Sequence, residues 1–400
     1  MPLSFDHPAF FWLALGTLLV WSAAVLDMAI HGLKTRFLRD IPPLDGPARP
    51  KVSVIVAGRD EERHVEEAAR SLLALAYEPL EVIFVDDRSS DRTGEILDRL
   101  AVSERKRVEG LATENPRFQV VHVTELPPGW LGKNHALDAG ARRATGEFLL
   151  FTDADVVMEP TLLARAVRVM VEGDLDHLAS GPDTVMPGVA LPAFVGAFLV
   201  LFALFTRPWK VRDPRSRAHI GIGAFNLVRA EAYRAVGGHR TIPLRVDDDL
   251  KLGKIMKLHR GRSDVLPGTG LMRLEWYASL GELIDGLTKN MFAGLEFRLP
   301  AVIGSTAGLL VGMVWPFAAI FLVAGPARWL NAASAALLMG IYAVTGRATN
   351  LKPWYAVSLP FGVLLFVYIL WRSTILTLWR GGVVWRGTLY PLRELKANKV

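Results

Sequence analysis

The sequence predicts an α/β domain built on a mainly parallel sheet, with transmembrane helices before and after it in the chain. Three observations lead to this fold class. Short apolar runs rich in β-branched residues alternate with helical segments in the middle of the chain. A long apolar stretch precedes this middle part, and a longer apolar block follows it. The composition agrees, because 51% of the 400 residues are hydrophobic.

The first element is an apolar stretch from Phe10 to Ile30, in which Asp27 is the one ionisable side chain. Its length is sufficient for a helix to cross a bilayer. A cleaved signal peptide is the alternative, but no Lys or Arg precedes the stretch, and Trp12 and Trp21 suit a retained anchor. Residues 1–40 are therefore expected to form an N-terminal transmembrane anchor with a basic flank.

The charges around this stretch predict which side of the membrane the next domain faces. Only two ionisable side chains, those of Asp6 and His7, precede it. The residues that follow it closely are mostly basic: His31, Lys34, Arg36 and Arg39. By the positive-inside rule, the domain at residues 41–297 is expected on the cytoplasmic face of the inner membrane. The sequence contains no cysteine, which fits a cytoplasmic domain but does not exclude other locations.

Within this domain, four apolar runs predict buried strands. They lie in KVSVIVAGRDEE, LEVIFVDDRSSDRT, RFQVVHV and GEFLLFTDAD. Helical segments separate them: Ala68, Leu72, Leu73 and Leu75 recur at helical spacing, and NHALDAGARRA precedes the fourth run. Alternating strands and helices form parallel sheets covered on both faces. Ligands of such sheets bind outside the carboxyl ends of the strands, where the acidic groups of the second and fourth runs fall.

Asp153 and Asp155 end the fourth run. On an extended backbone, residues two apart point to the same side, and the small Ala154 leaves room between them. Two close carboxylates repel each other and favour a divalent cation. Mg²⁺ or Mn²⁺ would suit, with water and substrate phosphate completing the oxygen ligands. The alternative is a turn in which these aspartates only close the strand.

Asp86 and Asp87 end the second run and precede RSSDRT. Alone, they could be turn residues before a helix that is capped by Ser90 or Asp91. Together with the acidic end of the fourth run, they favour a different interpretation. Two acidic strand ends in one parallel sheet predict a nucleotide pocket.

A third acidic cluster, Asp247 to Asp249, begins the segment DDDLKLGKIMK. An apolar stripe at helical spacing follows it: Leu250, Leu252, Ile255 and Met256. The aspartates therefore lie at a helix start, where the backbone dipole favours anions and where a single cap would be enough. Three in a row predict that at least one of them faces the binding cleft.

The uncharged segment 188–206 needs separate treatment, because hydropathy alone predicts that it crosses the membrane. A crossing there would put Asp153 and Asp155 on the opposite side from residues 247–249. If these carboxylates share one site, the segment has to lie in the membrane interface or pack on the domain. We expect an apolar helix of that kind.

The last element is an apolar block from Leu299 to Leu378. Breaks near residues 325–328 and 346–353 divide it into three candidate spans: 299–324, 329–344 and 354–378. Residues 298–400 are thus expected to form a transmembrane region of two to three helices with a basic tail. Three crossings would put the tail outside, against the charge rule, whereas two crossings and one re-entrant or surface helix keep it inside. The basic residues concerned are Arg380, Arg386, Arg393, Lys396 and Lys399.

The order of IVAGRDEE, VDDRSSDRT, GWLGKNHAL, TDAD, GIGAFNLVRAEAYRAVGG and VDDDLKLG resembles the inverting family 2 glycosyltransferases, over residues 51–261. The leading anchor, the trailing spans, LTKNMFAGLEF and VVWRGTLY are similar to the hopene-associated, carotenoid and ceramide glycosyltransferases. The resemblance implies a fold of glycosyltransferase A type. It also implies a hexosyltransferase that uses a nucleotide diphosphate sugar, a UDP-sugar in the first place, and a lipid hydroxyl as acceptor.

The resemblance further implies roles for the residues that match its motifs. Asp155 and Asp153 are expected to hold the Mg²⁺ or Mn²⁺ cofactor, and Lys133 is expected to neutralise phosphate. Asp249 matches the catalytic aspartate and Asp248 the glutamate before it, while an alternative register promotes Asp247. The expected nucleotide-sugar-binding residues are Ala57, Arg59, Glu61, Asp86, Asp87, Lys133 and Asp153.

The sequence also departs from the family's pattern. The motif of a Gln or Arg, two further residues and Arg-Trp, found in members that polymerise sugars, is absent, which puts chain elongation in doubt. RLEW at residues 273–276 is a poor substitute, whereas Lys289 in LTKN is a residue that could serve instead. Asp60 stands where asparagine is usual, and Ala57 where proline is frequent, so the base pocket is less certain than the metal site.

Other function classes remain as alternatives. These are a polysaccharide synthase subunit that elongates a glycan, and a non-catalytic membrane lipid-binding scaffold. A dinucleotide enzyme is disfavoured, because AGRDEE lacks a glycine fingerprint after the first strand. The net charge of +6 is consistent with membrane contact, and Arg212, Arg215 and Arg217 could meet anionic headgroups or form a solvated loop. No nucleic-acid module is visible, so no nucleic-acid partner is expected.

Overall fold

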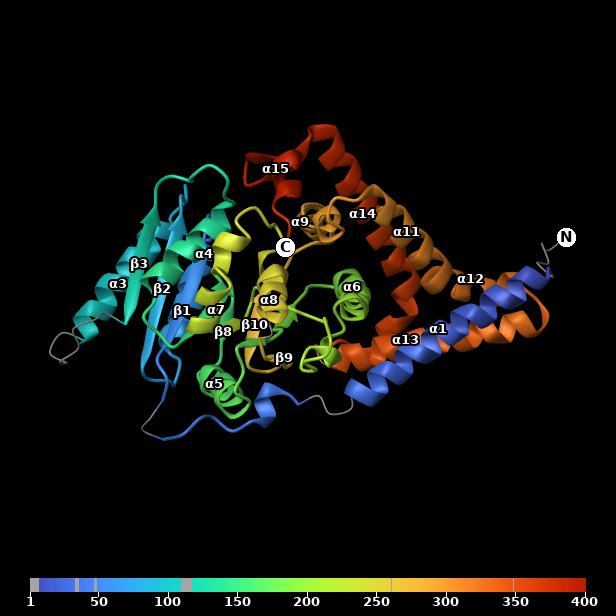
Figure 1. The fold of residues 1–400 in the computed structure, drawn as a ribbon, viewed down its shortest axis with the longest axis horizontal. Helices are drawn as coiled ribbons and strands as arrows, with labels where there is room; N and C mark the ends of the chain where they lie inside the picture. Colours follow the sequence, from blue (N-terminus) through green and yellow to red (C-terminus); the bar gives the residue numbers. More distant parts are fainter. Residues whose placement is uncertain (1–6, 33–35, 47–48, 109–116, 260, 348) are drawn as a thin grey trace. The chain divides into compact units, whose positions relative to one another are not determined.

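The computed structural model describes residues 7–32, 36–46, 49–108, 117–259, 261–347 and 349–400 (Figure 1). The chain forms two compact units. The sheet unit comprises Arg36–Val185, Lys210–Trp276 and Ala397–Val400. The helical unit comprises Met1–Thr35, Met186–Trp209 and Tyr277–Lys396, so parts of the predicted 41–297 domain belong to the helical unit.

A seven-stranded sheet forms the centre of the sheet unit (Figure 1). In spatial order its strands are β3 (Phe118–Val123), β2 (Leu80–Asp87), β1 (Val52–Gly58), β4 (Phe148–Asp153), β8 (Asn226–Arg229), β6 (His177–Ala179) and β9 (Ser263–Val265). β8 is antiparallel to both of its neighbours, and the other neighbouring pairs are parallel. The predicted α/β class with a mainly parallel sheet is confirmed.

Helices cover both faces of this sheet. Alternate residues of a strand point to opposite faces, and in the central strands the residues on both faces are apolar, so each face is buried under helices. Val54 and Val82 belong to one buried cluster, whereas Ile55 and Ile83 belong to another. The helices that contribute to the first cluster are α2 (Val65–Leu73), α3 (Thr93–Val108) and α5 (Leu162–Glu172). Those of the second cluster are α4 (Gly132–Arg143), α7 (Ala230–Ala235) and α8 (Asp248–Leu258).

The strand register brings the acidic strand ends to one edge of the sheet. Gly58 of β1 is paired with Asp86 of β2, and Ala57 of β1 is paired with Asp153 of β4. These three strands are parallel, so their carboxyl ends meet at the same edge. The edge is therefore acidic on both sides of β1.

Shorter strands and helices complete the two units. β5 (Val157–Met158), β10 (Met272–Glu275) and β7 (Asp183–Val185) form a three-stranded sheet in the sheet unit. In the helical unit, β11 (Gly382–Trp385) and β12 (Thr388–Pro391) form a hairpin that is followed by α15 (Leu392–Ala397). α9 (Leu280–Thr288) and α10 (Met291–Gly294) also belong there.

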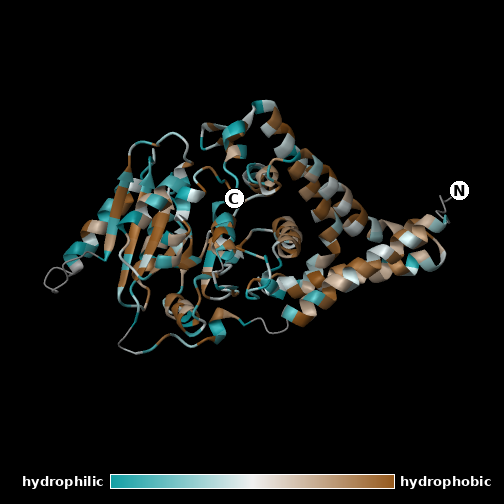
Figure 2. Cartoon of the chain, viewed as in Figure 1, coloured by the Kyte–Doolittle hydropathy of each residue, from teal (hydrophilic) through white to brown (hydrophobic). Residues whose placement is uncertain are grey.

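Five helical segments of the described chain are long and apolar enough to cross a membrane. Hydrophobic residues cover much of their length in Figure 2. They are α1 (Pro8–Gly32), α6 (Ala190–Thr206), the segment from α11 (Leu299–Leu309) to α12 (Trp315–Leu322), α13 (Gly325–Arg347) and α14 (Leu359–Arg380).

Two boundaries of these segments differ from the sequence prediction. A π-helical stretch, Leu310–Val314, joins α11 to α12. Pro316 explains it, because proline lacks an N–H group and its ring displaces a preceding carbonyl. Residues 325–328, expected as a break, open α13 instead, since Pro326 suits the first turn of a helix.

α6, at the segment where an apolar helix is expected, packs within the helical unit. Ala197 and Val200 of α6 share a buried cluster with Leu338 of α13 and Val363 of α14. Gly196 permits close packing, because a Cβ atom there would collide with the hydroxyl of Tyr342. The partners of α6 are thus other apolar helices.

Polar contacts fix α9 and α10 to α14. Arg372 Nη2 lies 2.7 Å from Asp285 Oδ1, and Arg372 Nη1 donates to Thr288 Oγ1 at 2.6 Å. Phe292 N donates to Ser373 Oγ at 3.1 Å. The segment that contains LTKNMFAGLEF is therefore a fixed part of the helical unit.

Candidate functional site

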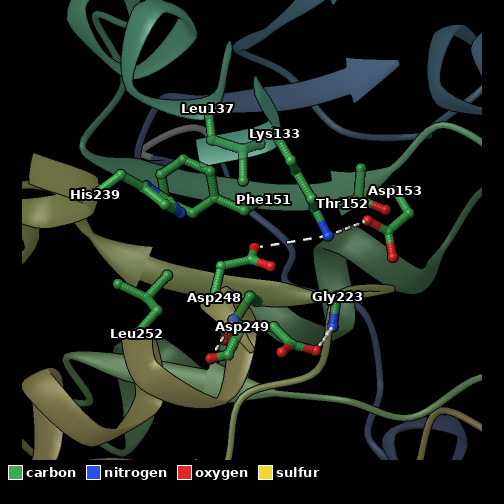
Figure 3. Close-up of a pocket in the computed structure, with 11 residues that line it drawn as sticks. Lys133, Leu137, Phe151, Thr152, Asp153, Gly223, His239, Asp248, Asp249 and Leu252 are labelled. Carbon is green, nitrogen blue, oxygen red and sulfur yellow. Dashed lines mark hydrogen bonds and ion pairs between the residues drawn. The ribbon is translucent and has the colours of Figure 1, made fainter. Parts of the chain in front are cut away.

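A pocket lies at the carboxyl end of β4 in the sheet unit (Figure 3). Its lining comes from α4, β4, β8 with the segment before it, the short 3₁₀ helix Gly238–Thr241 and the first half of α8. It brings together four of the predicted site residues, Lys133, Asp153, Asp248 and Asp249. The full lining is Lys133, Leu137, Phe151, Thr152, Asp153, Gly223, Asn226, His239, Asp248, Asp249 and Leu252.

Lys133 joins two of the acidic segments, as Figure 3 shows. Its Nζ atom lies 2.7 Å from Asp153 Oδ1 and 3.6 Å from Asp248 Oδ2. Burial opposes the charged ammonium group, but the negative charges of Asp153, Asp248 and Asp249 outweigh burial and raise the pKa of Lys133. The lysine therefore carries a positive charge at the centre of the carboxylates.

Two glycines allow Asp153 and Asp249 to approach the same stretch of backbone. Gly223 N donates to Asp249 Oδ2 at 2.9 Å, and a Cβ atom on Gly223 would lie 2.6 Å from Asp153 Oδ2. A Cβ atom on Gly221 would collide with the backbone oxygen of Asp249. The two carboxylates flank this segment because it carries no side chains at these positions.

The three aspartates at the start of α8 have different partners. Both carboxylate oxygens of Asp247 accept hydrogen bonds from Arg245, at 3.0 and 3.1 Å. Asp248 faces Lys133, and burial raises the pKa of Asp248 to about 7, with Lys133 opposing and Asp249 adding to the shift. Burial also raises the pKa of Asp249. Asp247 is thus engaged away from the pocket, while the other two line it.

Asp155 has a buried oxygen, Oδ1, with no hydrogen-bond partner. Burial, together with the charges of Asp153 and Glu61, raises the pKa of Asp155 to about 7. An orphaned carboxylate oxygen beside other carboxylates fits a divalent cation. Among the described residues, no three His, Cys, Asp or Glu side chains form a metal site by themselves. Water or substrate oxygens would therefore complete the coordination of a cation held by Asp153 and Asp155.

The loops after β1 and β2 are tied together beside this site. Asp60 Oδ1 accepts hydrogen bonds from the backbone N–H and the hydroxyl of Ser90, at 2.7 and 3.1 Å. Its φ of 55° is left-handed, a conformation that asparagine and aspartate tolerate better than most residues, so aspartate can replace the usual asparagine here. Arg59 Nε lies 3.6 Å from Asp60 Oδ2, and Glu61 N donates to Thr93 Oγ1 at 2.8 Å.

Asp86 and Asp87 are adjacent in β2 and so point to opposite faces of the sheet. Asp86 Oδ1 accepts from Ser89 N at 3.2 Å, and its Oδ2 lies 3.0 Å from His122 Nδ1. Asp87 accepts from Arg88 Nε and Nη2 at 2.8 and 3.1 Å. Its carboxylate also lies against the first residue of α4, Gly132. Asp87 is therefore on the α4 side, next to the residue that precedes Lys133.

Sequence reasoning missed two polar residues of the pocket, Asn226 and His239. Asn226 Nδ2 donates to the backbone oxygen of Asp249 at 3.3 Å, which links β8 to α8. His239 Nδ1 lies 2.8 Å from the hydroxyl of Tyr233, and burial lowers the pKa of His239 to about 3, so its ring is neutral. The sequence offered one signal for these two residues. Each follows glycines closely, Asn226 in GIGAFN and His239 in GGH, and glycines allow the chain to turn or to pack closely.

Residues 53–237 match the model of the family described as glycosyl transferase family 2. This part of the chain is therefore similar to the family 2 glycosyltransferases. It contains the strand ends at Asp86 and Asp153, the α4 lysine and the glycine segment before β8. The start of α8, with Asp248 and Asp249, follows directly after it.

Curated relatives of this glycosyltransferase agree with that family. The 4,4'-diaponeurosporenoate glycosyltransferase of Staphylococcus haemolyticus is 21% identical over 285 residues, which are 70% of this chain and 71% of that protein. The probable glycosyltransferase YdaM of Bacillus subtilis is 32% identical over 159 residues, which are 39% of this chain and 31% of that protein. The chain thus aligns with less than a third of YdaM. The resemblance to family 2 and the assignment as a transferase are confirmed.

A solved glycosyltransferase shares the fold. The mannosyltransferase PcManGT of Pyrobaculum calidifontis, solved in complex with GDP-Man and Mn²⁺, superposes with a TM-score of 0.54 at 20% sequence identity. The match covers 92% of this chain and 99% of that one. The glycosyltransferase A type of fold is confirmed by this likeness.

Proposed function

We propose that this glycosyltransferase is an inverting enzyme that moves a hexosyl group from a nucleoside diphosphate sugar to a hydroxyl group of a membrane lipid. The donor we expect is a UDP-sugar, and the acceptor is of the hopanoid, carotenoid or sphingolipid type. The approach of Lys133, Asp153 and Asp249 to one pocket is the observation on which this proposal rests. The pocket thus contains a positive charge that can bind phosphate (Lys133), a carboxylate that can bind a metal ion (Asp153) and a candidate base (Asp249).

The donor's diphosphate is proposed to bind beside Lys133 and Asp153. Asp153 and Asp155 would hold Mg²⁺ or Mn²⁺, which when bound stabilises the charge of the leaving diphosphate. Lys133 is already held toward this position and adds a positive charge there. The nucleoside would be bordered by Ala57, Arg59, Glu61, Asp86 and Asp87, which lie on or after the first two strands.

Asp249 is proposed to remove the proton of the acceptor hydroxyl. Backbone N–H groups of Gly223 and Leu250 orient its carboxylate, at 2.9 and 2.7 Å. Its burial raises the pKa and so strengthens it as a base compared with an exposed aspartate. Asp247 is less suited, because Arg245 occupies both of its oxygens. Attack of the deprotonated hydroxyl on the face of the sugar opposite the leaving diphosphate inverts the anomeric carbon.

A lipid acceptor is supported by the apolar helices and by one relative. Among its described residues, the helical unit holds five segments that are apolar enough to cross a membrane. The relative from Staphylococcus haemolyticus is named for glycosylation of 4,4'-diaponeurosporenoate, which suggests an apolar acceptor here as well. Exposed Arg212, Arg215 and Arg217 could approach anionic headgroups. We place the enzyme in the inner membrane with its sheet unit in the cytoplasm.

The test is donor turnover by the full chain purified in detergent. A panel of UDP- and GDP-sugars is assayed for release of the nucleoside diphosphate, with Mn²⁺, with Mg²⁺ and with chelator, and with or without polyprenoid and sphingoid acceptors. We expect metal-dependent turnover that an added lipid alcohol stimulates. Activity that is unaffected by chelator would contradict the metal site, growth of a glycan chain would favour a polysaccharide synthase, and no turnover of any donor would favour a scaffold.

The base is tested by Asp249→Asn, which keeps the shape of the side chain and removes its basicity. We expect kcat to fall about 10²- to 10⁴-fold while the donor's KM changes little. Asp247→Asn is compared with it, because Asp247 is the alternative candidate base and is engaged by the buried Arg245. A larger loss of kcat in Asp247→Asn than in Asp249→Asn, with an unchanged melting temperature, would reassign the base to Asp247.

A further inference from the structure

The last four residues of the chain, Ala397–Val400, belong to the sheet unit, although the segment before them belongs to the helical unit. Asn398 makes two side-chain hydrogen bonds there. Its Oδ1 accepts from Leu244 N at 3.1 Å, and its Nδ2 donates to the backbone oxygen of Thr241 at 3.1 Å. One side chain thus binds both a donor and an acceptor of the same loop.

Further contacts hold this end of the chain against the start of α8. Arg245 Nη1 donates to the backbone oxygen of Asn398 at 3.4 Å. Lys254 Nζ of α8 donates to the backbone oxygen of Val400, and the side chain of Val400 packs against the buried cluster that includes Leu252. The end of the chain therefore contacts both the loop before α8 and α8 itself.

The loop in question, residues 241–247, leads directly into Asp248 and Asp249. On its other side, the fully buried Asn134 of α4 donates to the backbone oxygens of Ile242 and Arg245, at 2.8 and 2.9 Å. Past Thr241 the loop has no helix or strand of its own. Side-chain hydrogen bonds from Asn134 and Asn398 help to hold its conformation. Leu131 N, which donates to the backbone oxygen of Pro243 at 2.8 Å, and the buried side chain of Ile242 hold it as well.

We propose that Asn398 is a positioning residue of the transferase. It holds the loop 241–247 in the conformation that aims Asp249 at the acceptor, in partnership with Asn134 on the opposite side. The inference rests on the proposed role of Asp249 as the base. It assigns a function in catalysis to the residues that follow the last apolar helices in the sequence.

The experiment compares the full chain in detergent with Asn398→Ala, Asn398→Asp and the control Lys399→Ala. Lys399 is the exposed neighbour of Asn398. The measurements are kcat and donor KM, amide hydrogen exchange of peptides that cover residues 241–250, and the melting temperature. For Asn398→Ala we expect kcat to fall about tenfold with donor KM within about twofold, and faster exchange confined to residues 241–250.

Asn398→Asp keeps the acceptor for Leu244 N and is expected to recover part of the lost kcat, while Lys399→Ala behaves as the unmodified chain. Unchanged kcat in Asn398→Ala overturns the proposal. A loss that comes with faster exchange throughout the sheet unit and a lower melting temperature also overturns it, since that pattern indicates general destabilisation. If the unmodified chain transfers no sugar, the proposed function fails. The role of Asn398 is then tested by hydrogen exchange alone, and it is refuted if Asn398→Ala leaves the exchange of residues 241–250 unchanged.

Discussion

At the scale of single residues, the pocket and the residues beside it gather carboxylates under conditions that disfavour their negative charge. Burial and neighbouring negative charge raise the pKa values of Asp155 and Asp248 to about 7. Aspartate in an unfolded chain titrates near about 3.9. A folded-state pKa above the unfolded value gives stability at low pH that is lost as the pH rises through the folded pKa. These residues therefore destabilise the empty fold at neutral pH, in exchange for a site that suits a cation.

Asp155→Asn is accordingly expected to stabilise the metal-free protein. The gain should be absent below about pH 4, grow between about pH 4 and 7, and stay level above that, because only the ionised form is penalised. Its size is at most about 4 kcal/mol, because the shift from about 3.9 to about 7 spans about three pKa units of about 1.4 kcal/mol each. Melting temperature against pH in chelator measures it. Added Mn²⁺ should then raise the melting temperature of the unmodified chain more than that of the variant.

Asp40→Asn serves as the control for this prediction, because Asp40 is an exposed aspartate with a long, weak contact of 3.9 Å to Arg39. It should leave the pH profile unchanged. A destabilised Asp155→Asn at pH 8 would show that the carboxylate makes favourable contacts in the empty fold, and would count against its role as a metal ligand.

At the scale of elements, close contact between α8 and the segment before β8 brings the acidic groups together. A Cβ atom on Gly221 would meet the backbone oxygen of Asp249, and one on Gly253 of α8 would meet the backbone oxygen of Ile220. Both glycines thus let two stretches of backbone touch. Since neither backbone can move without displacing the sheet or the helix, this contact fixes the distance from Asp153 to Asp249.

Gly221→Ala is therefore expected to lower both stability and turnover. Relief of the collision requires α8 to shift, so we expect a loss of about 2 kcal/mol or more in unfolding free energy and a drop in kcat. Gly181→Ala is the control, because the nearest atom to a Cβ there is Ile222 Cδ1 at 3.8 Å, an ordinary contact. Chemical denaturation with turnover assays measures both. Equal behaviour of the two variants would mean that α8 is not held by this contact.

The long elements could be predicted from the sequence, and the short ones could not. β1, β2, β3 and β4 each have at least six residues, enough to show a continuous apolar run. β5, β6, β7, β9 and β10 have two to four residues, too few for a pattern. The antiparallel direction of β8 depends on its partners in the sheet rather than on its own residues.

The same distinction applies to the site. The spacing of Asp153 and Asp155 predicts one acidic position, because period two is a property of any strand. The place of His239 in the pocket depends on Gly237 and Gly238, whose positive φ values turn the chain, and on the ring of Tyr233. Such packing between distant segments leaves no periodic signal, so reasoning from the sequence missed it.

At the scale of the whole molecule, the order of strands limits how the chain can cross a membrane. β8 follows α6 in the sequence, yet it lies between β4 and β6, which precede α6. The chain before and after α6 must therefore be on one side, so α6 cannot make a single crossing despite its apolar length. Residues 397–400 also belong to the sheet unit, so if the apolar helices between Trp276 and Ala397 cross a membrane, as proposed, they do so an even number of times. Two crossings agree with the charge rule, and three do not.

Single cysteines test this topology, because the natural sequence contains none. Ser103→Cys on α3 and Lys399→Cys near the chain end are both exposed. We expect a membrane-impermeant maleimide to label both in inside-out vesicles and neither in intact cells. Labelling of position 399 alone in intact cells would require an odd number of crossings and would also remove Asn398 from the sheet unit.

The placement of β8 also sets an order for synthesis. When β4 and β6 have left the ribosome, the gap between them has no strand to fill it, and the next product of translation is the hydrophobic α6. The nascent chain therefore exposes the unpaired edges of β4 and β6 together with the hydrophobic helix α6. This state lasts until Arg229, the last residue of β8, emerges. Early delivery to the bilayer, which shelters α6 while translation continues, would shorten the time that this aggregation-prone state is exposed. We expect the yield of soluble, folded sheet unit to depend on that delivery more than on the final stability of the protein.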